Sequence, residues 1–210
     1  LELHTPDGVV RANVRASDDP RELGEQDAVL VTVKQTALTA SAPAITALLG
    51  RDTPAVFLQN GIPWWYFHGQ GNADEGKRIP ELDPGDVLWN TVGPQRAVGG
   101  VTSSPCTVVE PGVVKLAGKN GTMVFGEPDG SMSPRLMAIA ELFKAAGLPS
   151  HDRQSVLAWC GWAHSLLWRP VDSSDGLRAE AGATGRAQDH LGKGTARAVV
   201  SGNAGRAVVG

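Results

Sequence analysis

Two polar residues follow directly on apolar stretches that the sequence predicts as buried strands. Lys34 ends residues 27–34, Asp-Ala-Val-Leu-Val-Thr-Val-Lys, and Asn60 comes soon after residues 55–58, Ala-Val-Phe-Leu, with Gly61 beside it. A lysine ammonium attracts anionic groups, and a carboxamide can donate and accept hydrogen bonds at once. Taken alone, Lys34 is also readable as a solvated lysine at a strand end, and Asn60 as a turn residue in an Asn-Gly pair. Their chemistry therefore depends on whether the fold brings them together.

The elements around these residues predict that it does. The two apolar stretches are nearly continuous, which is typical of strands covered on both faces in a parallel sheet. Between them we expect a helix with Ser41 as its N-cap, Pro43 in its first turn and Gly50 at its end. Such a strand-helix-strand unit places the carboxyl ends of both strands at one sheet edge, where ligands bind in open α/β sheets.

An aromatic run follows the asparagine turn: residues 64–68 read Trp-Trp-Tyr-Phe-His. These side chains could form a packed aromatic cluster, or they could line a cleft from which apolar bulk excludes water. Both interpretations stay open at this point.

Four motifs resemble those of one known family. They are Val-Thr-Val-Lys at 31–34, Gln-Asn-Gly-Ile-Pro-Trp-Trp-Tyr-Phe-His-Gly at 59–69, Val-Val-Glu-Pro-Gly-Val-Val at 108–114 and Gly-Glu-Pro-Asp-Gly at 126–130. In this order, and spanning roughly residues 1–148, they resemble the ketopantoate reductase (2-dehydropantoate 2-reductase) family. The resemblance implies an NADP-dependent oxidoreductase that reduces ketopantoate, a small 2-keto acid, to pantoate in pantothenate biosynthesis.

The resemblance also implies roles for individual residues. Lys34 and Asn60 would bind the substrate, and Lys34, Asn60 and Gly61 would bind the NADP cofactor. The acidic residues of the later motifs, Glu110 and Glu127, could be read as general acids, but their turn and edge positions favour structural roles.

The expected fold class is α/β: a partial Rossmann-like NADP-binding domain with added antiparallel strands, followed by a degraded start of a helical domain. We place the first domain at residues 1–150 and the vestige of the helical substrate domain at 151–210. No Gly-x-Gly-x-x-Gly motif precedes residue 27, so the resemblance implies that the phosphate-binding half lies upstream of Leu1.

The other expected elements follow from turn and cap signals. A hairpin is predicted over residues 1–14, and antiparallel strands over 106–109, 113–116 and 122–126 extend the parallel core. A helix is predicted to begin at Ser133-Pro134 and to end at Gly147.

The carboxyl-terminal part departs from the family. Where the family has a catalytic lysine in Trp-x-Lys-Leu, this chain reads Trp-Ala-His-Ser-Leu at 162–166, so we assign no catalytic residue and expect this fragment to be inactive. Residues 171–210 are poor in large apolar side chains, which predicts a largely disordered tail. We hypothesise a shifted reading frame, because codons permitted for residues 169–176, read one base later, can spell Asp-Pro-Leu-Thr-Ala-Leu-Thr-Gly, close to the family's Asn-Pro-Leu-Thr-Ala-Leu-Thr-Gly.

Composition narrows the classes of partner. The 210 residues carry a formal net charge of −3, which argues against a nucleic-acid partner. Two cysteines make no disulfide framework, no apolar run approaches the ~20 residues of a membrane span, and no metal-ligand spacing is present. We expect a cytoplasmic protein without a metal; the oligomeric state is left open.

Two alternatives remain from the residues alone. Cofactor-domain motifs do not determine the substrate, so another NAD(P)-dependent 2-hydroxyacid or sugar-acid dehydrogenase fits as well. A non-catalytic nucleotide-binding or structural remnant is the other alternative.

Overall fold

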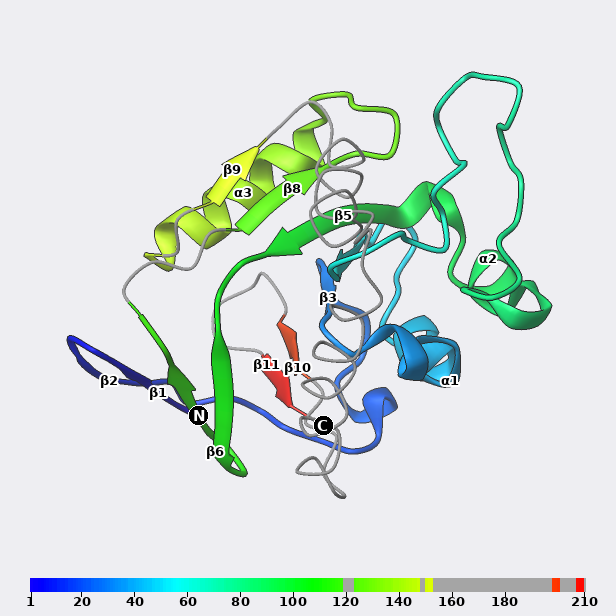
Figure 1. Ribbon diagram of the computed structural model, residues 1–210. Helices are drawn as coiled ribbons and strands as arrows, with labels where there is room; N and C mark the ends of the chain where they lie inside the picture. The colour runs from blue at the N-terminus through cyan, green and yellow to red at the C-terminus, as the bar shows by residue number, and fades with distance from the viewer. Residues whose placement is uncertain (119–122, 148–149, 153–197, 201–206, 210) are drawn as a thin grey trace, which may run out of the picture.

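The fold is organised around a five-stranded sheet with the order β3-β4-β5-β8-β9 (Figure 1). The computed structural model describes residues 1–118, 123–147, 150–152, 198–200 and 207–209. The strands are β3 (Val29–Val31), β4 (Ala55–Leu58), β5 (Ala97–Thr102), β8 (Met123–Gly126) and β9 (Ser150–Asp152). β3, β4 and β5 are parallel, whereas β8 is antiparallel to β5 and parallel to β9. The predicted parallel core with an antiparallel extension is confirmed.

Apolar side chains cover both faces of this sheet. On one face Val56, Val98 and Phe125 pack with Leu136 and Ile139 of α3 (Pro134–Ala145). On the other face a larger cluster joins the sheet to α1 (Gln35–Thr46) and α2 (Val87–Thr91), which lie side by side (Figure 1). Alternate residues of β3 and β4 enter opposite clusters, which explains why these two strand sequences are uninterruptedly apolar.

Helix α1 begins earlier than the sequence predicts. Its N-cap is Lys34, in extended backbone (φ −64°, ψ 151°), and not Ser41, whose buried hydroxyl donates to the Ala37 carbonyl at 2.8 Å. Pro43 lies inside the helix on its exposed side. Leu38 is fully buried, so one additional apolar turn outweighs the hydrogen bond that the missing Pro43 N–H removes. As a result, the helix N-terminus directly follows Lys34.

A second sheet of four strands has the order β2-β1-β7-β6. Its strands are β1 (Glu2–Thr5), β2 (Gly8–Arg11), β6 (Cys106–Glu110) and β7 (Val113–Leu116). The predicted hairpin at the start of the chain is confirmed as β1 and β2. The prediction that β6 and β7 extend the parallel core is wrong, because β7 pairs with β1, and of the three antiparallel strands predicted there only β8 joins the core sheet. Both β6 and β7 lack buried residues, so core packing does not hold them against the central sheet.

The remaining elements are a capped helix, a strand pair in the tail and short 3-10 helices. Ser133 caps α3 by accepting from the Leu136 amide at 3.1 Å, as predicted. In the tail, β10 (Ala198–Val200) and β11 (Ala207–Val209) form an antiparallel pair. Residues 162–166 and 169–176, which carry the missing-lysine and reading-frame predictions, lie outside the described residues, as does most of the predicted disordered tail. Among the described residues, the short 3-10 helices are η1 (Pro20–Glu22), η2 (Pro84–Asp86) and η3 (Pro94–Arg96). Within the described ranges, no helix combines the length and apolar character that a membrane crossing needs.

Candidate functional site

Lys34 lies at the carboxyl edge of the parallel strands, as the sequence predicts. It is exposed and forms the N-cap of α1 without a side-chain hydrogen bond to the helix, whose first turn holds no acidic residue. The first amides of a helix have no partner within the helix, and they carry the positive end of its dipole. Among the described residues, no ion pair neutralises the Lys34 ammonium. The Lys34 ammonium therefore lies beside the N-terminus of α1, which itself carries partial positive charge. Together they attract anions.

Asn60 emerges at the same edge, from the neighbouring strand β4. Its Nδ2 donates to the Thr102 carbonyl at 3.0 Å, and its Oδ1 accepts from the Thr102 amide at 3.2 Å. The side chain thus closes the end of β4 onto the end of β5. Because a carboxamide has two donor hydrogens and two acceptor lone pairs, one of each remains on this exposed residue for a ligand.

Gly61 leaves the backbone beside Asn60 open. Its φ of +119° lies in the region that favours glycine, and a Cβ built there would meet no heavy atom within 4 Å. The peptide next to Asn60 is therefore accessible to a closely approaching group.

The aromatic run divides into two parts. Trp64 and Trp65 are each 1% exposed, and Trp64 makes edge-to-face contacts with Phe57 (5.6 Å between ring centroids) and Trp89 (6.1 Å). The two tryptophans therefore belong to the packed core beneath the site, in agreement with the cluster interpretation. Tyr66, Phe67 and His68 are half-buried, so only these residues remain for lining a cleft.

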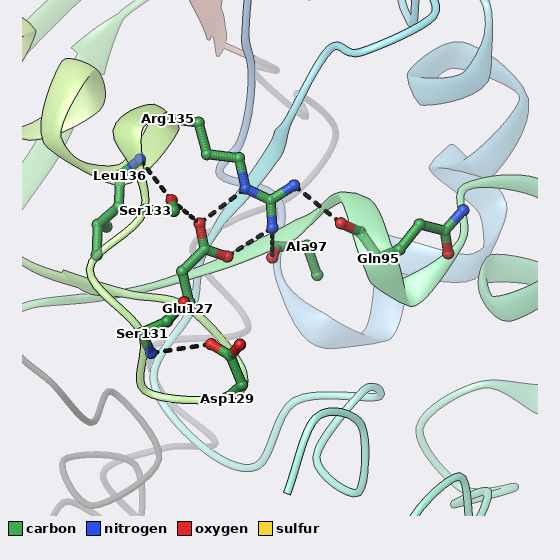
Figure 2. A network of polar contacts seen from close by, with 8 residues as sticks. All are labelled: Gln95, Ala97, Glu127, Asp129, Ser131, Ser133, Arg135 and Leu136. Carbon is green, nitrogen blue, oxygen red and sulfur yellow. Dashed lines mark hydrogen bonds and ion pairs between the residues drawn. The ribbon is translucent and has the colours of Figure 1, made fainter.

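Glu127 has a structural role in the ion-pair network of Figure 2. Its side chain is 4% exposed; Arg135 donates to Oε1 through Nε (2.7 Å) and to Oε2 through Nη2 (2.5 Å), and the Ser133 hydroxyl also donates to Oε1. The hydrogen bond with Glu127 raises the pKa of Arg135 above its ordinary value. Arg135 also donates to the Gln95 carbonyl at 2.8 Å, which ties α3 to the start of β5. Glu110 lies exposed on β6 in the second sheet.

A carboxylate organises the loop after the aromatic run. Glu75 accepts from the Gly69 amide at 2.8 Å and from the Gly71 amide at 2.9 Å, and its Oε1 lies 3.6 Å from His68 Nδ1. The hydrogen bonds from Gly71 and then Gly69 hold the pKa of Glu75 below its ordinary value of 4.5. This carboxylate therefore stabilises the loop fully above that ordinary value, and the stabilisation is lost as the pH falls through the lowered pKa.

We expect acidification to release this loop. We would measure hydrogen exchange by NMR as a function of pH. The protection of the Gly69 and Gly71 amides should decrease once the pH is below 4.5, because a protonated carboxyl accepts hydrogen bonds more weakly. Replacing Glu75 with glutamine should lower the protection at neutral pH to about the wild-type acid level and remove the acid step. An acid step that persisted in Glu75→Gln would assign the effect to another group.

The chain is similar in sequence to proteins of one known family. Residues 1–130 match the family described as ketopantoate reductase PanE/ApbA. The 2-dehydropantoate 2-reductase of Mesorhizobium japonicum is 38% identical over 168 residues, which cover 79% of this chain and 51% of that protein. The enzyme of the same name from Pyrococcus abyssi is 29% identical over 72 residues, covering 34% of this chain and 23% of that protein. The chain thus spans about half the length, or less, of the curated relatives that it matches.

Solved structures agree. A crystal structure assigned as a ketopantoate reductase, from Ralstonia solanacearum MolK2, has a TM-score of 0.70 and 34% identity, covering 75% of this chain and 48% of that chain. D-mandelate dehydrogenase, solved with NADH and anilino(oxo)acetate, has a TM-score of 0.51 at 20% identity, covering 72% of this chain and 43% of that one, and shares the fold alone. With a Rossmann-like core and a family match over residues 1–130, the chain belongs to the ketopantoate reductase PanE/ApbA family.

Proposed function

We propose that this chain forms the cofactor- and substrate-facing edge of an NADPH-dependent 2-dehydropantoate 2-reductase, which reduces ketopantoate to pantoate. The observation that carries the proposal is the placement of Lys34 as the N-cap of α1, where no side-chain hydrogen bond caps the helix, with Asn60 just after the adjacent strand β4. Both substrate and cofactor are anionic, and this edge offers a cation together with partial positive charge. Residues 1–150 would form the dinucleotide-binding domain and residues 151–210 the start of the substrate domain, in a cytoplasmic protein.

The residues present fit the NADP group. Lys34 would attract the carboxylate of the keto acid and the charged parts of the cofactor. Asn60 would orient the ligands with its remaining N–H and lone pair, and Gly61 would let them approach the backbone. When bound, the cofactor supplies the hydride for the ketone. We assign no proton donor within the described residues. The role proposed for this chain is therefore to bind and orient the cofactor and the keto acid.

Removing the charge of Lys34 should weaken ligand binding. Lys34→Met is expected to reduce the affinity for NADPH about tenfold, because an ionic contact contributes roughly 1.5–3 kcal/mol in favourable geometry and less when exposed. The measurement is a fluorescence titration of NADPH excited through the tryptophans. Lys144→Met is the matched control: Lys144 is exposed and pairs with Glu141 on α3, so its loss should leave NADPH affinity unchanged. Equal affinity in Lys34→Met and the wild type would remove Lys34 from the site.

Substrate choice separates the remaining alternatives. Ketopantoate-dependent oxidation of NADPH by the full-length parent, compared with oxidation by other 2-keto acids such as phenylglyoxylate, would distinguish the proposed reductase from another 2-hydroxyacid dehydrogenase that shares the fold. If the full-length parent binds NADPH but turns over no 2-keto acid, a nucleotide-binding role would be favoured. Absence of both binding and turnover would leave a structural role.

A further inference from the structure

Gln59 connects three strand ends at the edge where Lys34 and Asn60 lie. Its side-chain Nε2 donates to the Val33 carbonyl at 2.9 Å, just before Lys34, and its backbone amide donates to the Gly100 carbonyl of β5 at 2.9 Å. The next residue, Asn60, makes the two bonds to Thr102 described above. The segments that follow β3 and β4 are therefore linked directly by the Gln59 side chain, beyond the point where the β3–β4 ladder ends.

The orientation of the Gln59 amide follows from its partner. Because Val33 presents a carbonyl, only the NH2 side of the amide can face it, and Oε1 must point away. That oxygen is buried and has no hydrogen-bond donor. A buried acceptor without a donor disfavours folding, so the side chain is an inefficient way to stabilise the sheet alone. What it provides is a defined spacing between the segment that carries Lys34 and the segment that carries Asn60.

We propose that Gln59 is a positioning residue: through its Nε2 bond to Val33 it holds Lys34 and the α1 N-terminus in place relative to Asn60. It acts through these neighbours and does not itself need to touch a ligand. Gln59 thereby joins the residues of the proposed site. Its expected effect on NADP⁺ binding rests on the proposed function. The positional part stands on geometry alone, which allows the two to be tested separately.

Hydrogen exchange tests the positional part on the full chain without a ligand. Two amides report on the two sides of Gln59: Ala37, which donates to the Lys34 carbonyl, and Thr102, which donates to Asn60 Oδ1. In Gln59→Met, which has similar length but no donor, we expect protection at both amides to fall about fivefold, the loss corresponding to one hydrogen bond. Gln59→Glu keeps the shape but not the donor, and at neutral pH its carboxylate would face the Val33 carbonyl, so the loss of protection should be at least as large.

A matched variant at the opposite end of the sheet controls for general destabilisation. Gln26 is buried and donates through Nε2 to the Leu23 carbonyl at 2.9 Å, near the amino ends of the strands. Gln26→Met should lower the global unfolding midpoint without a selective loss of protection at Ala37 and Thr102. Wild-type protection at both amides in Gln59→Met and Gln59→Glu would overturn the proposal, and so would an equal loss in Gln26→Met.

Titration of the same variants with NADP⁺ measures whether the loss of the Gln59 hydrogen bond weakens ligand binding. If the wild type binds NADP⁺, Gln59→Met and Gln59→Glu should bind it about fivefold or more weakly, whereas Gln26→Met should bind it normally once corrected for the folded fraction. Unchanged affinity in both Gln59 variants would overturn a positioning role toward the ligand. A wild type that does not bind NADP⁺ would refute the proposed function, while the exchange result would still decide whether Gln59 sets the spacing.

Discussion

Replacing Trp64 with alanine is expected to lower the free energy of unfolding by about 4 kcal/mol, the scale measured for large aromatic residues in cores. Trp64 is 1% exposed and contacts Phe57 and Trp89 edge to face, so its removal leaves a cavity that rigid neighbours cannot close. Denaturant unfolding followed by far-UV circular dichroism would measure the change.

The same substitution separates packing from ligand contact. For the fraction that stays folded, NADPH affinity in Trp64→Ala should match that of the wild type, because the ring lies beneath the site. Tyr66→Ala is the control within the aromatic run: Tyr66 is half-buried, and its loss should cost about 1–2 kcal/mol. A small loss of stability combined with a large loss of affinity in Trp64→Ala would instead favour the cleft interpretation.

Replacing Arg135 with methionine is expected to cost about 3 kcal/mol. The substitution leaves the Glu127 carboxylate, 4% exposed, without its charged partner, and removing one member of a buried ion pair typically costs 3–5 kcal/mol. We take the lower end because the Arg135 side chain is 34% exposed and water can partly replace it. The measurement is the free energy of unfolding at neutral pH.

Two variants show whether the buried charge is the cause. In the double variant Glu127→Gln with Arg135→Met, part of the loss should be recovered, because no buried charge remains unpaired. Lys144→Met breaks the exposed Lys144–Glu141 pair on the same helix and should change stability by less than about 0.5 kcal/mol. Equal losses in Arg135→Met and Lys144→Met would contradict the network of Figure 2 as a stabilising feature.

The position of the candidate site was predictable because it depends on backbone rules. Two continuous apolar strands joined by a helical segment specify a parallel pair, and a parallel pair brings Lys34 and Asn60 to one edge. Helix α3 was also predictable, since Ser133, Pro134 and the apolar spacing act locally. By contrast, the start of α1 was misplaced, because the proline signal at Pro43 is local whereas the burial of Leu38 is tertiary.

Other features depend on pairings between distant parts of the chain. β7 pairs with β1, and Glu127 pairs with Arg135. Each of these contacts joins separate segments of the chain, and no local sequence pattern specifies it. The link from Gln59 to Val33 spans 26 residues in the same way, and the sequence signals only that a polar residue follows the strand.

The sequence by itself determined the family motifs, the parallel strand pair and the edge at which Lys34, Asn60 and Gly61 lie. These features depend on the spacing of apolar residues and on turn-forming residues, which are properties of short local segments. Only the tertiary structure decided that Trp64 and Trp65 are core, that Glu127 is paired, and that Asn60 spends half of its hydrogen-bonding capacity on Thr102. The physical reason is that burial and hydrogen-bond partnership belong to pairs of segments, and which segments meet is settled by the packing of the whole sheet.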